Sequence, residues 1–354
     1  MFDYLEQLET ERTWERFTSS IFNLLGNSNE ADYLENVSVL GSTSLIVDSK
    51  RNIVRSTLNE HLYWSPHTLN RVWFEDKKIL NLMINERFKF LDAIKRLFFK
   101  MLGADQTEVF SDDYTYIYIA HAFGWYAFGH LHDSLQRLFS VRNLLVEGKV
   151  KLVVSDPYRI VNFHLHLSAL IGFEVNESDL IVLNPKTLYS FKKLVVPYSP
   201  AIATNYTKET YAWVARGYLT KFVDQSDHSQ LSGIYLSRNH VSPGTRSVTN
   251  EPQIIDYLSA KGFKVLYGTE SLSEIVNSFY RAKVVIGPHG SLFANTIYCQ
   301  DDCKIYEFCA DNRVDHSFRN KFKAAKHYEH QLCPADSAFN IEIPIKTLEA
   351  IFNR

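Results

Sequence analysis

Several side chains in the C-terminal half of the chain are of the types that bind phosphate groups. Two arginines follow one short apolar segment, a His-Gly-Ser triplet follows another, and a glutamate ends a third. Guanidinium groups pair with phosphate oxygens, backbone N–H groups at a helix start hold phosphate, and a carboxylate can accept both hydroxyl groups of a ribose. Together they predict a site for a nucleoside diphosphate. The residues are Ser237, Arg238, Arg246, His289, Gly290, Ser291 and Glu307.

The segments that precede these residues have the features of strands in one parallel sheet. Each apolar segment is short, and a segment with helical features separates it from the next. This alternation is typical of a doubly wound, Rossmann-like fold, in which ligands bind outside the carboxyl ends of the strands. The predicted strands are 233–237, 263–267, 283–287 and 304–308, and the predicted helices are 251–261, one that begins at Ser271, and 292–298.

Residues at the helix starts also have structural interpretations. Asn250 is suited to cap the helix 251–261, and Glu251 is a first-turn acid that the helix dipole favours, so we weigh a structural role for both against donor binding. Ser271 and Glu274 have the spacing of a capping box at the start of the next helix.

The loop residues have plain alternatives too. Arg238 and Arg246 could be solvated cations, but the pair lies where a ligand is expected. His289 stands in a glycine-flanked turn from strand to helix, which lets the backbone and the imidazole approach a ligand closely. We therefore favour ligand binding for these three residues, whereas Glu307 alone is equally compatible with a structural role.

A second polar set lies on a predicted helix at 129–141. On a helix, His130, Asp133 and Arg137 fall within about 60° of one another, away from a stripe of leucines. The polar trio could face a cleft while the leucines are buried. Alternatively, Asp133 and Arg137 form an i,i+4 ion pair on a solvated face, worth a few tenths of a kcal/mol. The leucines are Leu131, Leu135 and Leu138.

The N-terminal half has fewer regular signals. Residues 1 to about 105 lean towards helix, as in 77–102, where apolar residues recur at helical intervals. Strands alternating with helices follow, which implies a mostly parallel sheet. The predicted strands are 114–120, 151–155 and 180–183, with a further apolar run at 192–197, and the predicted helices are 159–171 and 208–223.

The length of 354 residues exceeds the size at which one core usually keeps growing, so we expect two domains. Prolines and small residues at 197–205 indicate a boundary there. The prediction is an N-terminal domain at 1–205 and a C-terminal domain at 206–335. Residues 336–354 are considered as a segment that packs back on the first domain.

Composition excludes several classes of protein. The 38 basic and 40 acidic residues give a formal net charge of −2, without the basic excess that nucleic-acid binding requires. No apolar run approaches the roughly 20 residues of a membrane span, and the N-terminus lacks the apolar region of a signal peptide. We therefore expect a cytoplasmic protein. The four cysteines fit no common zinc pattern, and we expect buried free thiols.

The motifs together resemble glycosyltransferase family 61. The runs YLSRNHVSPGTRSVTNE (235–251), VVIGPHGSLFAN (284–295) and KIYEF (304–308) agree with the family in order and spacing. GHLHDSLQRL (129–138) is similar to its His-x-x-Asp helix, and 316–332 is similar to the helix and strand that close its domain. Leu292 departs from the small residue that the family often has two places after the turn glycine.

The resemblance implies the GT-B fold: two Rossmann-like domains with a cleft between them, the donor bound by the second domain and the acceptor by the first. It also implies transfer from a nucleotide-sugar, here expected to be a UDP-sugar, with inversion at the anomeric carbon. Inversion needs one general base, for which Asp133 or His130 is the candidate. Arg238, Arg246 and the backbone at Gly290 would stabilise the leaving diphosphate in place of a metal. The chain contains no Asp-x-Asp motif, which agrees with a metal-independent reaction without a cofactor.

Two alternatives remain open at this point. The fold and the His-Gly turn could hold another phosphorylated donor, such as a pyruvyl donor, for transfer to a saccharide. The chain could also be a non-catalytic module that binds saccharides. The expected partners are a nucleotide-sugar and a saccharide or glycan acceptor in polysaccharide biosynthesis, and a peripheral contact with a membrane face is compatible with that role.

Overall fold

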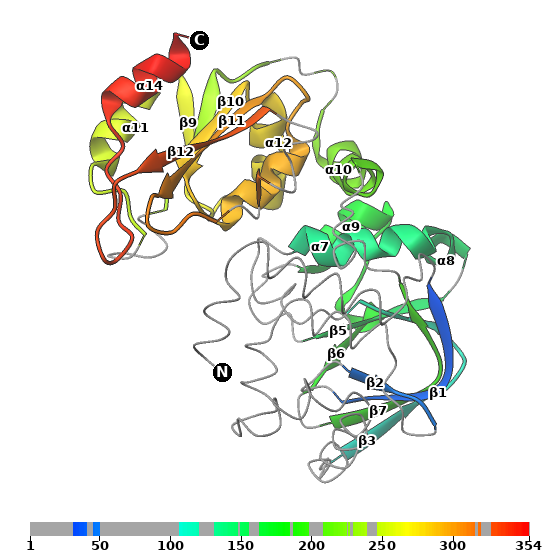
Figure 1. Ribbon diagram of the computed structural model, residues 1–354. Helices are drawn as coiled ribbons and strands as arrows, with labels where there is room; N and C mark the ends of the chain where they lie inside the picture. Colours follow the sequence, from blue (N-terminus) through cyan, green and yellow to red (C-terminus); the bar gives the residue numbers. More distant parts are fainter. Residues whose placement is uncertain are drawn as a thin grey trace. The chain divides into compact units, whose positions relative to one another are not determined.

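The computed structural model describes residues 31–40, 45–49, 106–119, 131–147, 149–155, 163–184, 187–197, 208–224, 226, 229–238, 246–315, 318–319 and 327–353. These residues form two compact units (Figure 1). The first lies within residues 1–126, 133–164 and 175–206, and the second lies within 127–132, 165–174 and 207–354. The predicted boundary at 205/206 and the helix-leaning segment 77–102 fall outside the described residues.

The first unit contains a mixed sheet in the order β2-β1-β7-β4-β5-β6, with β3 also paired to β7. The pairs among β3 to β7 are parallel, whereas β1 runs antiparallel to both β7 and β2. The strands are β1 (Asp32–Leu40), β2 (Leu45–Val47), β3 (Gln106–Phe110), β4 (Thr115–Tyr118), β5 (Val150–Ser155), β6 (Leu180–Leu183) and β7 (Thr187–Val196).

Strands β4, β5 and β6 confirm three predicted strands, and the apolar run 192–197 belongs to β7. The helical tendency expected for the first 105 residues is wrong at β1 and β2. Val37 and Val39 are buried in the core of this sheet, with Ser38 between them. This alternation has the period of two that is typical of a strand. It covers too few residues to be recognised as a strand within a long segment of mixed composition.

The predicted helix 129–141 is observed as separate pieces. The α-helix α7 (Leu131–Leu135) passes into the 3-10 helix η2 (Gln136–Val141), and α8 (Arg142–Glu147) follows. The later helices confirm their predicted positions, since α9 (Phe163–Ile171) and α10 (Lys208–Phe222) lie within the expected ranges. A short 3-10 turn, η3 (Glu177–Asp179), precedes β6.

The second unit contains a fully parallel sheet in the order β12-β11-β10-β8-β9. The chain starts at β8, passes to β9 on one side, and then crosses to β10 on the other side, so the order reverses between β8 and β10. This is the topological switch point of a doubly wound sheet. The strands are β8 (Gly233–Leu236), β9 (Phe263–Leu266), β10 (Val284–Pro288), β11 (Lys304–Ala310) and β12 (His327–Cys333).

Gly287 allows these two central strands to pack closely. A Cβ atom at this position would lie 2.8 Å from the Cβ atom of Leu236 and 2.9 Å from its carbonyl oxygen. Glycine is therefore required next to β8, one residue before the turn that leaves the sheet.

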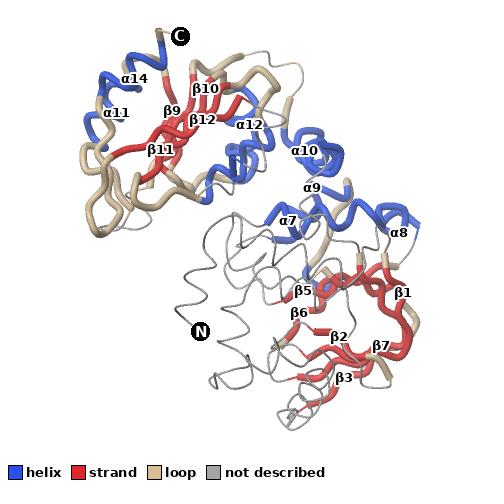
Figure 2. Tube along the Cα trace, viewed as in Figure 1, coloured by secondary structure: helices blue, strands red, loops and turns tan. Residues whose placement is uncertain are grey.

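Helices cover both faces of this sheet (Figure 2). α11 (Glu251–Ser259) and α14 (Ile345–Phe352) pack on one face, where Leu348 and Ile351 join Tyr235 and Ile254 in one buried core. The unit also contains α10, α12 (Leu272–Arg281), the 3-10 helix η4 (Ser291–Tyr298) and most of α9. The proposal that 336–354 packs back on the first domain is therefore wrong, because the apolar side of α14 completes the core of the second unit.

The capping predictions have different outcomes. The Ser271 side chain accepts a hydrogen bond from the Glu274 backbone N–H at 3.2 Å, as predicted. Asn250 precedes α11 but makes no side-chain capping bond. Its amide instead bridges the backbone of Ile343, donating to the carbonyl at 2.8 Å and accepting from the N–H at 3.1 Å. Among the described residues, no helix has the length and apolar character needed to cross a membrane.

Candidate functional site

The predicted phosphate-binding residues gather at the carboxyl edge of the second sheet, beside its switch point. Ser237 and Arg238 directly follow β8, and His289 and Gly290 directly follow β10. The two strands are neighbours in the sheet. Parallel strands that diverge to opposite sides leave a crevice at this edge, which is where doubly wound proteins bind their ligands.

Arg238 lies against the turn that follows β10. Its guanidinium Nη1 donates a hydrogen bond to the His289 carbonyl oxygen at 3.0 Å. The turn itself is fixed to the sheet by the His289 backbone N–H, which donates to the Phe308 carbonyl at 2.8 Å. A Cβ atom on Gly290 would lie 2.6 Å from Arg238 Nη1, so any other residue here would force the guanidinium group to move.

Two polar atoms beside this turn are buried and have no hydrogen-bond partner among the described residues. They are the Ser237 hydroxyl oxygen and the Arg238 Nε. Buried polar groups are nearly always paired, because an unpaired donor costs about 1–3 kcal/mol and more when it is charged. A hydroxyl group and a guanidinium N–H group that are buried without a partner, next to a glycine turn, indicate a binding site for an anionic ligand.

Three arginines create a positive potential at this edge. Burial, followed by the charges of Arg246 and Arg313, lowers the pKa of Arg238 to about 10. Burial and Arg313 also lower the pKa of Arg246, against a smaller opposing effect of Asp315. Like charges held together in this way favour an anion that neutralises them.

The chain holds two of these arginines by specific local structure. Arg246 has a left-handed backbone, with φ of 54°, and its N–H donates to the Ala338 carbonyl at 3.0 Å. Arg313 places its guanidinium over the Phe339 ring, 4.9 Å from the centroid. Sequence reasoning missed Arg313, because it follows β11 in a loop without a motif.

Glu307 has a different environment from the one expected. Its side chain has no exposed surface. Oε1 accepts from His289 Nδ1 at 2.7 Å, and Oε2 lies 2.8 Å from the Tyr328 hydroxyl and 3.0 Å from His330 Nε2. Because both oxygens are occupied inside the protein, this arrangement does not support direct contact with a ribose. Glu307 instead fixes the orientation of the His289 ring.

Hydrogen bonds determine the charge of this buried carboxyl group. Burial raises its pKa, but the bonds from His289, His330 and Tyr328 outweigh burial and hold the pKa of Glu307 below its ordinary value. The Tyr328 hydroxyl responds in the opposite sense, since burial and the Glu307 charge raise its pKa well above the usual range. Glu307 is therefore a carboxylate with three donors.

Tyr328 and His330 were not predicted from the sequence. They lie on β12, and the parallel register pairs His330 with Glu307 directly across from β11. Tyr328 and His330 are two positions apart in the last predicted strand, so they share one face of it. This spacing could have identified them as partners of Glu307 once the strand was placed beside β11.

Glu251 also acts within the protein. It is buried, and its Oε1 accepts from the Tyr235 hydroxyl at 3.0 Å and from the Arg238 backbone N–H at 3.3 Å. It therefore holds the backbone that carries Arg238. Asn250 is engaged by the Ile343 backbone, as described above, so its amide reaches no ligand in this arrangement.

Ser291 is the first residue of η4 and is exposed. The preceding Gly290 has an extended backbone, and the helix that follows is a 3-10 helix rather than the predicted α-helix. The first N–H groups of any helix have no partner within it, so a 3-10 helix separated from β10 by two residues keeps the predicted means of holding a phosphate.

The candidate general bases are only partly described. His130 lies outside the described residues, and Asp133 lies on α7 with its side chain outside them. The predicted stripe is confirmed, since Leu131, Leu135 and Leu138 are completely buried. The i,i+4 ion pair on a solvated face is not supported, because Arg137 is 1% exposed and the helix changes to 3-10 geometry before it.

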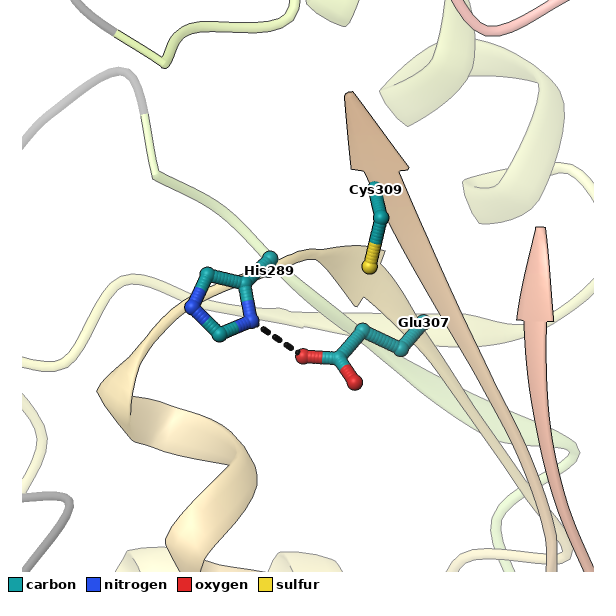
Figure 3. Close-up of side chains that lie close together, drawn as sticks. All are labelled: His289, Glu307 and Cys309. Atoms are coloured by element: carbon teal, nitrogen blue, oxygen red, sulfur yellow. Dashed lines mark hydrogen bonds and ion pairs between the residues drawn. The ribbon is translucent and has the colours of Figure 1, made fainter. Parts of the chain in front are cut away.

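A potential metal-binding cluster lies at the same edge (Figure 3). His289, Glu307 and Cys309 each offer one ligand atom, and these atoms lie within 4.8 Å of one another. The prediction for the four cysteines is confirmed, since Cys299, Cys303, Cys309 and Cys333 are all buried free thiols.

Comparison with known proteins relates this chain to one family. The family model for Glycosyltransferase 61 matches residues 128–306, about half of the chain. No curated protein matches the sequence. The matched range includes α7 and the chain through β8, β10 and the first part of β11, and it ends one residue before Glu307.

Proposed function

Because this chain belongs to glycosyltransferase family 61, we propose that it transfers a sugar from a UDP-sugar to a saccharide or glycan acceptor, without a metal and with inversion at the anomeric carbon. Membership in the family implies a glycosyltransferase, and therefore a sugar donor and an acceptor. The donor nucleotide, the stereochemical course and metal independence are our proposals. The product would be an extended polysaccharide.

The observation that carries the proposal is the pair of unpaired buried polar atoms beside the glycine turn. Ser237 Oγ and Arg238 Nε point to an anion at the switch point, where the family match and the sheet topology both lead us to expect a donor. We place the diphosphate there, between Arg238, Arg246 and the backbone N–H groups of Gly290 and Ser291. Three arginines lie at this edge, and the charge of a diphosphate matches them better than the charge of a single phosphate group does.

In this proposal the arginines stabilise the charge that develops as the diphosphate leaves. Removing one donor of this kind from an enzyme typically costs about 2.7–4 kcal/mol in transition-state stabilisation. The His289 ring, held by Glu307, adds an imidazole at the same turn. These groups would replace the charge of a divalent cation, so the reaction needs none.

The acceptor hydroxyl needs a general base on the side opposite the leaving group. We assign this role to Asp133 or His130, which match the His-x-x-Asp motif. The proposed arrangement is GT-B, with the second unit as the nucleotide-sugar-binding domain and the first unit as the acceptor-side domain. We expect a cytoplasmic enzyme whose only membrane contact is peripheral.

Thermal-shift measurements with UDP, GDP and CMP, each with and without EDTA, test the donor assignment. A ligand at a hundredfold excess over its Kd stabilises the protein by about 2.7 kcal/mol. We expect an EDTA-insensitive shift with UDP that Arg238→Ala removes. Arg216→Ala is the matched control, because Arg216 is an exposed arginine on α10. The absence of a shift with every nucleotide, or a shift that survives in Arg238→Ala, would contradict the proposed donor site.

A further inference from the structure

His289, Glu307 and Cys309 present an imidazole, a carboxylate and a thiol to one small space (Figure 3). Glu307 and Cys309 are two positions apart on β11, so both side chains lie on the same face of the strand. His289 reaches the same space from the end of the neighbouring strand β10. Nitrogen, oxygen and sulfur donors in this combination are the ligands that zinc takes in proteins.

Contacts around the cluster resemble those that support metal ligands. The Nε2 atom of His289, on the far side of the ring, lies 3.5 Å from Asp315 Oδ2. A metal-binding histidine usually donates its other N–H group to a carboxylate, which fixes the ring and strengthens the ligand. The Oε2 atom of Glu307 is held by Tyr328 and His330, which leaves Oε1 directed towards His289 and the cluster.

The charges at the sulfur also favour a cation. The carboxyl groups of Glu307 and Asp315 lie near the Cys309 sulfur and the His289 ring. The same negative charges that oppose a thiolate attract a divalent cation, which in turn stabilises the thiolate. His289 is the member of the cluster that meets solvent, since its side chain is 20% exposed whereas that of Glu307 is completely buried.

We propose that His289, Glu307 and Cys309 form a binding site for a thiophilic divalent cation such as Zn²⁺, and that the bound ion inhibits the donor site. The first half of this proposal stands on the cluster itself. The second half rests on the proposed function, because it requires that His289 and Gly290 contact the donor.

Small movements would allow the ion to bind. Two ligand atoms of a tetrahedral zinc site lie about 3.3–3.7 Å apart, given zinc–ligand bonds of roughly 2.0–2.3 Å. The His289 Nδ1 to Glu307 Oε1 distance of 2.7 Å must therefore widen by less than about 1 Å, and the Cys309 sulfur already lies within 4.8 Å of both atoms. As the bonds to the metal form, the thiol proton leaves to solvent, and His289 binds through Nδ1 as the neutral ring, with its one proton on Nε2 facing Asp315.

Widening this pair moves the His289 ring relative to Glu307. The turn that carries the ring also carries Gly290, whose backbone we assign to the donor phosphate. Metal and nucleotide would therefore oppose one another, and each would reduce the affinity for the other by the same factor.

Cd²⁺ titration of the full chain tests the site without any assay of activity. A bond from Cd²⁺ to a thiolate gives an ultraviolet charge-transfer band. We expect one equivalent of Cd²⁺ to produce the band in the wild type, Cys309→Ser to lose it, and Cys333→Ser to keep it. Cys333 is the matched control, because it is also a buried free thiol but lies outside the cluster. No band, or a band that persists in Cys309→Ser, would overturn the site.

The effect on the donor is measured by UDP binding in EDTA and in Zn²⁺. We expect Zn²⁺ to weaken UDP binding at least tenfold in the wild type and in Cys333→Ser, and to have less than a twofold effect in Cys309→Ser. Unchanged or tighter binding in the wild type would overturn inhibition. Failure of UDP to bind even in EDTA would count against the proposed function, and the Cd²⁺ band would still decide the metal site.

Discussion

Replacing Tyr328 by phenylalanine removes one hydroxyl group from the network around Glu307 and leaves the ring in place. The hydroxyl lies 2.8 Å from Oε2 of a carboxylate that has no exposed surface. A hydrogen bond to a charged group contributes about 1.5–3 kcal/mol, and water cannot easily replace this one because Tyr328 is also buried. We therefore expect Tyr328→Phe to lower the free energy of unfolding by about 2 kcal/mol at neutral pH.

The loss should depend on pH in a defined direction. The hydrogen bonds lower the pKa of Glu307 in the folded protein below its value in the unfolded chain, which is about 4.3. Its contribution to stability is therefore fully present above the unfolded pKa and disappears as the pH falls through the folded pKa. The difference between wild type and Tyr328→Phe should be largest near pH 7 and should shrink below about pH 4.

Thermal unfolding at a series of pH values measures this difference. For a unit of 150–250 residues, about 2 kcal/mol corresponds to a decrease in Tm of roughly 4–8 °C. Tyr280→Phe is the control, because Tyr280 is half-buried on α12 and its hydroxyl has no hydrogen bond within the described part of the chain. A decrease as small as that of the control, or one that grows towards acid pH, would refute the assignment of Tyr328 as a partner of ionised Glu307.

Two glycine substitutions separate binding from stability. Gly290→Ala should weaken UDP binding at least tenfold with little change in Tm, because the added Cβ meets only the flexible end of Arg238, 2.6 Å away; equal UDP affinity in titration calorimetry would contradict the role of this turn. Gly287→Ala should instead lower Tm, since its Cβ would meet Leu236 backbone and Cβ atoms at 2.8–2.9 Å, and overpacking typically costs about 1–3 kcal/mol. An unchanged Tm for Gly287→Ala in scanning calorimetry would show that β8 and β10 can separate without cost.

The second unit was predicted well because local signals and global structure agree there. Each strand from β8 to β11 is a short apolar segment, and each is followed by polar residues at the edge where ligands bind. The first unit gave weaker signals, since β1 lies in a long segment whose apolar spacing resembles a helix. Its antiparallel pairing with β7 joins residues more than 140 positions apart, such as Val37 and Phe191, and no local pattern encodes that contact.

The candidate site shows where inference from residue types fails. Arg238, His289 and Gly290 were placed correctly at one edge, because the rule for strand ends needs only the strand order along the chain. The roles of Glu251 and Glu307 required knowledge of their neighbours. An acidic residue within a strand or at a helix start can face a ligand or be buried, and only the hydrogen bonds from Tyr235, Tyr328 and His330 distinguish the two.

Most of the hydrogen-bond network around Glu307 lies C-terminal to the residues that match the family, and it depends on the register between β11 and β12. The match ends at residue 306, whereas Glu307 and its β12 partners follow it. A carboxylate completely removed from water is stable only when several donors hold it, and His289 alone supplies one. The pairing of Glu307 with His330 brings the other two donors onto the adjacent strand. Any change that shifts β12 by one residue would turn these side chains to the opposite face and leave the carboxylate with His289 alone. The orientation of the His289 ring therefore depends on β12, although the side chains of β12 hydrogen-bond to Glu307 and not to that ring.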